Sequence, residues 1–144
     1  MSYGIKAYKA VGVKDDLAVA DPHRVIQLLM QGALENMAKA KGFIERKDYS
    51  GKSTTLSKAM AIINSLQSSI DMNVSGEISN NLHSLYGFMH EHLIVASREM
   101  SIEKVQEVMD ILLTIKSAWD QIPVADREAA YSMRAKNTQE VGVA

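Results

Sequence analysis

The chain has 144 residues, a net charge of −1 and ordinary apolar and charged fractions, which predicts one globular domain and argues against wholesale disorder. It contains no cysteine, which excludes disulfides, thiol catalysis, Cys-type zinc sites and iron–sulfur clusters. The near-neutral charge gives no overall electrostatic footprint for nucleic acid, although a local basic patch is still allowed. No uncharged stretch is long enough to span a bilayer, so we expect a soluble cytoplasmic protein without membrane insertion.

A helical domain is predicted over residues 21–123, after an N-terminal strip over residues 1–20 that is expected to be partly mobile. Asp21-Pro22 is a strong helix start, because an N-cap acceptor is followed by proline at the first helical position. The apolar residues of this first helix recur at three- and four-residue spacing: Val25, Ile26, Leu29, Ala33, Met37, Ala40 and Ile44. A charged exit over residues 45–48 separates it from a second helix that begins near Gly51. The second helix carries one narrow apolar stripe: Leu56, Ala59, Met60, Ile63, Leu66 and Ile70.

Two further helices follow a loop predicted over residues 71–76. The third helix has an apolar face consisting of Ile78, Leu82, Leu85, Met89, Leu93 and Ala96. Ser101 is predicted to cap the fourth helix and Pro123 to stop it. Residues 124–144 are expected to be a polar tail in which Asp126–Lys136 can form a short fifth helix. Short connections between long helices predict an all-α, antiparallel four-helix up-and-down bundle.

The third and fourth helices are more apolar than a bundle requires. The apolar arc of the fourth helix spans about 200°, because Ile111, Ile115 and Ile122 extend one side and Ile102 and Leu113 the other. The third helix carries a second line, with Phe88 and Val95 seven residues apart and Ile94 almost opposite the core face. Two interpretations stay open: the fourth helix is covered by its neighbours, or the extra faces receive amphipathic helices from another chain.

Gly87 is predicted on the outer face of the third helix, together with Ile94. An interior glycine costs roughly 1 kcal/mol relative to alanine, and no bundle contact would require a missing side chain there. A close approach by another backbone would explain the residue, and an ordinary tolerated glycine is the alternative.

The four histidines do not form the pattern of a metal site. A carboxylate-bridged dimetal bundle needs Glu-x-x-His on two helices, and none of the four has a Glu three residues before it. We therefore expect no metal and no cofactor, and histidines that face solvent on outer helix faces.

Residues 83–87, His-Ser-Leu-Tyr-Gly, resemble the His-x-Leu-Lys-Gly motif of histidine phosphotransfer domains, which are also four-helix bundles. Tyr86 stands at the lysine position of that motif and supplies no positive charge to offset a phosphoryl group. A phosphotransfer bundle using His83 is the alternative function, and a helical subunit that only self-associates is a third.

The order of several motifs is similar to that of the flagellin export chaperones, the FliS family. Tyr8…Val11, Asp21-Pro22 and the aliphatic run to Gly32-Ala33 resemble the N-terminal signature of that family. The third helix resembles its Leu-Tyr-x-Phe-Met-x-x-x-Leu-x-x-Ala pattern, and the fourth ends in Ala118-Trp119 as in the family. The resemblance runs from about Tyr8 to Trp119. Met30 and Gln31 depart from the usual Tyr-Asp pair.

The resemblance implies a non-enzymatic cytoplasmic chaperone without a cofactor. It would bind the disordered C-terminal segment of flagellin, prevent premature polymerisation and keep the segment competent for flagellar type III export. It leaves open a second partner, either the export apparatus or a flagellar regulatory protein, and a homodimer.

The predicted partner-binding residues combine the resemblance with the surplus apolar positions. In the strip, Ile5, Tyr8 and Val11 are three residues apart, and we expect their apolar edge to cover a groove when no client is bound. The remaining residues lie on the first, third and fourth helices: Leu28, Tyr86, Gly87, Phe88, Ile94, Val95, Ile111 and Ile115.

Overall fold

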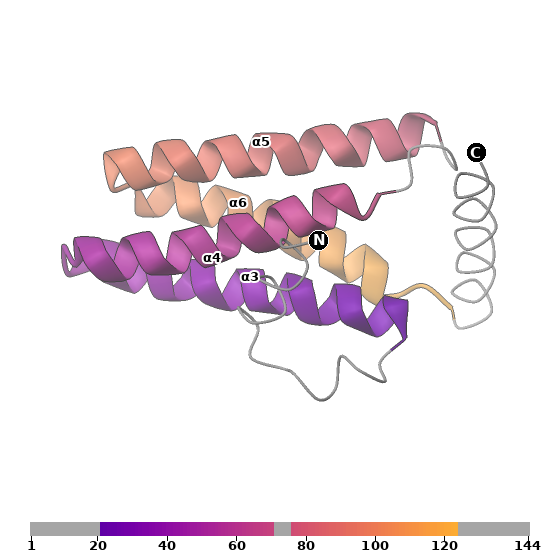
Figure 1. Ribbon diagram of the computed structural model, residues 1–144, viewed down its shortest axis with the longest axis horizontal. Helices are drawn as coiled ribbons and strands as arrows, with labels where there is room; N and C mark the ends of the chain where they lie inside the picture. Colours follow the sequence, from indigo (N-terminus) through magenta and orange to yellow (C-terminus); the bar gives the residue numbers. More distant parts are fainter. Residues whose placement is uncertain (1–20, 71–75, 124–144) are drawn as a thin grey trace, which may run out of the picture.

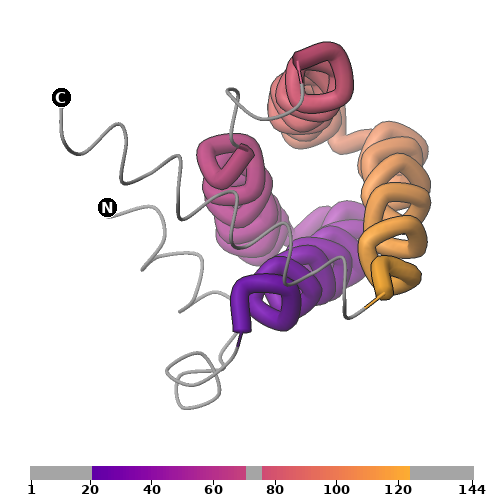
Figure 2. Tube along the Cα trace, turned by 90° about the vertical axis from the view of Figure 1, so that its right-hand side faces the viewer, coloured from indigo at the N-terminus to yellow at the C-terminus, as the bar shows by residue number. Residues whose placement is uncertain are grey.

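Four α-helices run alternately up and down in the computed structural model, which describes residues 21–70 and 76–123 (Figure 1). They are α3 (Pro22–Glu45), α4 (Tyr49–Ser68), α5 (Glu77–Glu99) and α6 (Ile102–Asp120). Consecutive helices pack on each other, and α6 packs even more extensively on α3 than on α5, so the helices form a ring around the core (Figure 2). The predicted four-helix bundle is confirmed. The N-terminal strip and the fifth helix lie outside the described residues.

Side-chain caps define three of the four helix starts. The Asp21 carboxylate accepts a hydrogen bond from the Arg24 amide at 2.8 Å, and the Ser101 hydroxyl accepts one from the Lys104 amide at 3.1 Å, as the sequence predicts. The Asp48 carboxylate accepts from the Gly51 amide at 2.9 Å. The second helix therefore begins at Tyr49, slightly before the predicted start near Gly51, because Asp48 is its N-cap.

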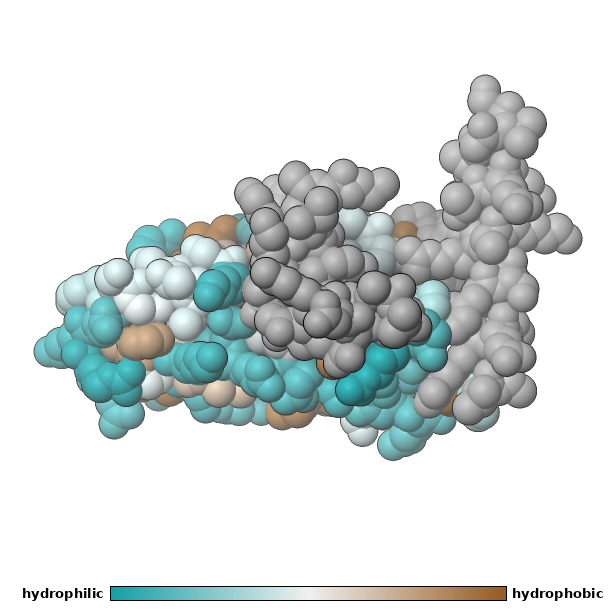
Figure 3. Space-filling model, turned by 60° about the horizontal axis from the view of Figure 1, so that its bottom comes forward, coloured by the Kyte–Doolittle hydropathy of each residue, from teal (hydrophilic) through white to brown (hydrophobic). Residues whose placement is uncertain are grey.

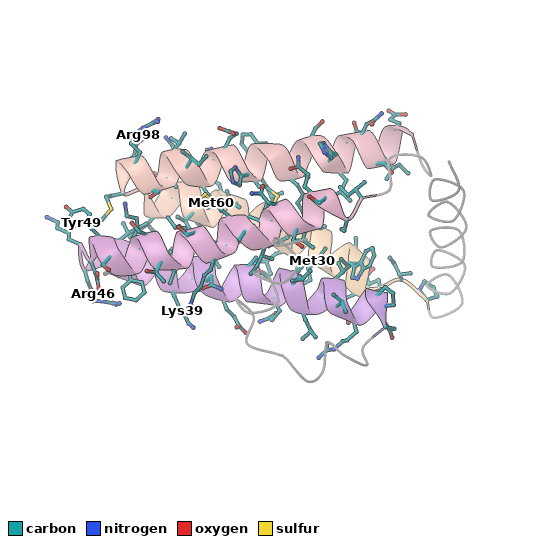
Figure 4. The ribbon with its side chains drawn as sticks, in the orientation of Figure 1. Met30, Lys39, Arg46, Tyr49, Met60 and Arg98 are labelled. Atoms are coloured by element: carbon teal, nitrogen blue, oxygen red, sulfur yellow. The ribbon has the colours of Figure 1, made fainter. Side chains whose placement is uncertain are left out.

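Leucine and isoleucine side chains fill most of the interior, together with alanine, valine and methionine. Met37, Met89 and Ala33 are fully buried, and Met30 is 1% exposed. Met60 is only partly buried, and Figure 4 shows it between the helices. The methionines among the described residues therefore serve mainly as adaptable core filler.

His23 joins the start of α3 to the end of α6. Its ring stacks on the indole of Trp119 with centroids 4.9 Å apart, and its Nε2 lies 2.8 Å from the Trp119 carbonyl oxygen. The Trp119 indole N–H in turn donates to the His23 carbonyl at 3.0 Å. His23 is 2% exposed, so the prediction of a solvent-facing histidine is wrong there. The cause is a partner distant in sequence, which satisfies both the ring and the backbone.

Asp120 adds polar contacts to this junction. Its carboxylate accepts hydrogen bonds from the Gln27 amide and from the Lys116 ammonium, both at 2.8 Å. The hydrogen bond from Lys116 holds the pKa of Asp120 below its usual range. The last turn of α6 is thereby held against α3.

Candidate functional site

The exposed large apolar side chains concentrate on two helices. Five of the six belong to α5 and α6: Ile78, Phe88, Ile94, Ile102 and Leu113. Tyr49, at the start of α4, is the sixth. On the α3 side drawn in Figure 3, hydrophobic side chains are instead scattered between hydrophilic ones. The surplus of apolar surface therefore belongs to α5 and α6.

The two helices diverge along their length. They lie side by side near the turn that joins them, and α6 then crosses toward α3 while the start of α5 stays apart (Figures 1 and 2). The contacts of His23 with Trp119 and of Gln27 with Asp120 hold the end of α6 on α3. The first half of α5 therefore has little of α6 to pack against, although its apolar face continues.

A polar bridge marks the point at which the helices begin to separate. The His92 Nε2 lies 2.5 Å from the Glu107 Oε2, and the Phe88 ring stacks on the His92 ring with centroids 5.0 Å apart. Phe88 is one turn before His92 and Ile111 is one turn after Glu107. Because the helices are antiparallel, Phe88 and Ile111 come to the same level across the junction.

Half-buried apolar side chains continue from this level toward the open end. We call this surface the α5–α6 seam: Leu82, Leu85, Phe88, Ile111, Ile115 and Trp119. All except Phe88 pack against the core while staying partly accessible, and Phe88 is 50% exposed. A surface of this kind can pack against an apolar helix face without first uncovering the core.

The structure places some of the predicted site residues on the α5–α6 seam, one on the opposite flank of α5, and the others elsewhere. Phe88, Ile111 and Ile115 lie on the α5–α6 seam, and Val95 is half-buried two turns beyond Phe88 on the same flank of α5. Ile94, which is 39% exposed, lies on the opposite flank, toward α4.

The other predicted residues lie elsewhere. Tyr86 is 2% exposed within the core, and burial raises the pKa of its phenol above the usual range, so the ring is neutral. Leu28 is half-buried on α3. Ile5, Tyr8 and Val11 lie outside the described residues.

Gly87 faces α4 rather than open solvent. A Cβ atom at this position would lie 3.2 Å from the Gln67 Nε2, which donates a hydrogen bond to the His83 carbonyl at 3.0 Å. The predicted outer-face position is therefore wrong, because α5 is rotated so that this flank packs against α4. Gly87 leaves room for the Gln67 side chain.

The sequence predicts Leu82 and Leu85 on the apolar face of the third helix and gives Trp119 only in the family-like end of the fourth, so it predicts none of the three as a binding residue. Their helical spacing is that of a core face, and nothing in it shows that the opposing helix turns away. The exposure of Ile78, at 72%, has the same cause. The apolar arc of α6, wider than a bundle requires, was the one available signal.

Within residues 21–70 and 76–123, no group of three His, Asp or Glu side chains could hold a metal ion. None of the four described helices is long and apolar enough to cross a membrane. The surface feature that stands out on these helices is the apolar α5–α6 seam.

Comparison with known proteins shows the family of the chain. The family model described as "Flagellar protein FliS" matches residues 4–126. The chain is 38% identical over 123 residues to the flagellar secretion chaperone FliS of Vibrio cholerae, covering 85% of this chain and 90% of that protein. It is 39% identical over 118 residues to FliSB of Pseudomonas aeruginosa, covering 82% and 94% of the two chains. The corresponding protein of Salmonella typhimurium is 38% identical over 120 residues, covering 83% and 89%. The chain therefore belongs to the FliS family of flagellar secretion chaperones.

Proposed function

We propose that this protein binds the C-terminal segment of flagellin in the cytoplasm, and that the segment packs as an amphipathic helix on the α5–α6 seam. As a member of a chaperone family, the chain is a binding protein and not an enzyme. Family membership also decides against the alternative in which His83 carries a phosphoryl group. The seam is proposed as the binding surface because exposed and half-buried apolar side chains concentrate on α5 and α6.

The seam suits a client that must later be released. A disordered segment that folds on binding loses conformational entropy, so part of the contact free energy is offset by ordering. Apart from Phe88, the seam residues are already packed on the core, so we expect the chaperone itself to need little rearrangement. Covering the exposed half of Phe88 would contribute about 1 kcal/mol. Several contacts of this size give specific binding that can be reversed at the export gate.

The N-terminal strip is proposed as a cover for the seam in the free protein. Its apolar edge, formed by Ile5, Tyr8 and Val11, has the chemistry of a short amphipathic segment. A cover of this kind would compete with the client and protect the seam from self-association. Contact with the export apparatus or a regulatory protein, and a homodimer, are consistent with such a surface.

A matched pair of variants tests the assignment to the seam. Phe88→Ser removes the most exposed seam side chain, whereas Leu113→Ser removes a similarly exposed apolar side chain, 47% exposed, on the other flank of α6. Titration calorimetry with the flagellin C-terminal segment should show about tenfold weaker binding for Phe88→Ser. Leu113→Ser should bind like the unmodified protein. Equal effects of the two variants would contradict the seam as the binding surface.

A further inference from the structure

The turn between α3 and α4 is strongly basic in an otherwise near-neutral protein. Residues 39–58 contain six basic and two acidic side chains, whereas the whole chain has a net charge of −1. The basic residues are Lys39, Lys41, Arg46, Lys47, Lys52 and Lys58. Such a local concentration of one sign of charge attracts a partner of the opposite sign.

None of these cations has a carboxylate partner among residues 21–70 and 76–123. The salt bridges of that part of the chain join His92 to Glu107, Lys104 to Glu99 and Lys116 to Asp120. Within the basic stretch itself, the Asp48 carboxylate is engaged in capping α4.

Two of the lysines are held by neutral groups. Lys41 donates to the Gln106 amide oxygen at 2.5 Å, and Lys52 donates to the Ser97 carbonyl at 3.0 Å. The positive charge of the turn is therefore not neutralised within this part of the fold.

The Arg46 side chain is positioned by an aromatic ring. Its guanidinium carbon lies 5.0 Å from the centroid of the Phe43 ring, a cation–π contact that leaves the N–H edge available for hydrogen bonds. The backbone of Gly51 packs directly on the Phe43 ring, since a Cβ there would lie 2.4 Å from a ring carbon. A Cβ at Gly42 would lie 3.1 Å from the Arg46 Nη1. The two glycines thus leave the space that the stacked pair occupies.

Lys39 and Arg46 lie on one face of α3, and Tyr49 extends the surface onto α4. The two cations are seven residues apart, which is two helical turns or about 10 Å. Tyr49 is 61% exposed, and the Lys52 ammonium lies 5.9 Å from the centroid of its ring. Figure 4 shows Lys39, Arg46 and Tyr49 along the edge of the bundle at the α3–α4 end. We call Lys39, Arg46, Lys47 and Tyr49 the basic turn.

We propose that the basic turn docks an acidic segment of a partner protein, with a carboxylate received by the stacked guanidinium of Arg46. A guanidinium presents a planar fork of donors that matches a carboxylate in a bidentate arrangement. The separation of Lys39 and Arg46 equals two turns of helix, so an acidic helix with carboxylates seven residues apart would reach both cations.

An acidic protein segment fits this surface better than a membrane or a nucleic acid. Among the described residues of α3 and α4, Tyr49 is the one exposed large hydrophobic side chain, which leaves little to insert into a bilayer. The basic residues of this surface are confined to the end of the bundle where α3 turns into α4, whereas a surface that follows a phosphate backbone carries its cations along a longer track. Binding to either of these is therefore an outcome that would count against the proposal.

The basic turn is separate from the α5–α6 seam. The seam opens toward the start of α5, whereas the basic turn lies at the other end of the bundle, where α3 turns into α4 (Figure 1). A partner on the basic turn and a client on the seam can therefore be bound at the same time. Binding at the basic turn can therefore be tested independently of client binding at the seam.

The test uses a fluorescent decaglutamate peptide as the probe, with the full chain at low ionic strength. Fluorescence anisotropy should show saturable binding that weakens as salt is added. Arg46→Gln should weaken it about tenfold, and Arg46→Lys should restore only part of the loss, because lysine keeps the charge without the fork. Arg24→Gln is the matched control, since Arg24 is an exposed arginine at the other end of the same helix.

Three results would overturn the proposal. They are no binding of decaglutamate, an equal loss for Arg46→Gln and Arg24→Gln, or tighter binding to phosphatidylglycerol vesicles or a short single-stranded RNA than to the peptide. Calorimetry with the flagellin segment should be unchanged by Arg46→Gln, which separates this outcome from a failure of the seam assignment.

Discussion

Gly51 and Gly87 both lie within helices, but they face very different neighbours. Gly51 lies against the flat face of the Phe43 ring, and Phe43 in turn supports the guanidinium of Arg46. Gly87 lies opposite the end of the Gln67 side chain, which can move. The sequence alone predicts neither neighbour, because both contacts are set by how one helix rotates against the next.

Alanine substitution at these glycines should therefore have unequal effects. Gly51→Ala places a Cβ within 2.4 Å of a ring carbon and should lower the free energy of unfolding by about 1–3 kcal/mol, because the ring must shift. Gly87→Ala meets only the mobile Gln67 amide at 3.2 Å and gains helix propensity, so its effect should lie within about 1 kcal/mol of zero. Urea unfolding followed by circular dichroism measures both. A larger loss for Gly87→Ala than for Gly51→Ala would contradict the packing described.

The starts of the helices and their apolar core faces can be predicted from local sequence. Asp21-Pro22 and Ser101 are short-range signals, and both cap the helices that they predict. Asp48 lies within the charged run over residues 45–48, which the sequence predicts as a helix exit, whereas in the structure its side chain caps α4.

The seam could be predicted only in part. The apolar surplus on α6 pointed to Ile111 and Ile115, but the divergence of α5 from α6 depends on His23 and Trp119, which are distant in sequence. Long-range contacts of this kind leave no periodic trace in either helix.

The proposed covering role of the N-terminal strip can be tested by deleting it. Deleting residues 1–12 removes Ile5, Tyr8 and Val11 and should strengthen binding of the flagellin segment about threefold or more, because a competing cover is gone. The truncated protein should also self-associate more readily, since its seam is exposed. Calorimetry and sedimentation velocity measure the two effects. Unchanged affinity together with unchanged self-association would contradict the covering role.

The whole molecule keeps its apolar and its basic surfaces apart. The seam opens where α6 leaves α5 for α3, and the basic turn lies at the other end of the bundle (Figures 1 and 4). This separation suits a chaperone that holds a client on one surface while a second partner contacts another. The core between them contains fully buried Leu93, Val105 and Leu112, and we expect this close-packed core to change little on binding.

The central claim is that the client folds against an apolar surface of this bundle. Calorimetric titration of the flagellin C-terminal segment at several temperatures tests it most directly, because burial of apolar surface gives a negative heat-capacity change. We predict one-to-one binding with a heat-capacity change on the order of −0.5 kcal/mol/K, made smaller by Phe88→Ser. Binding with a heat-capacity change near zero, or no heat at any temperature, would contradict the claim.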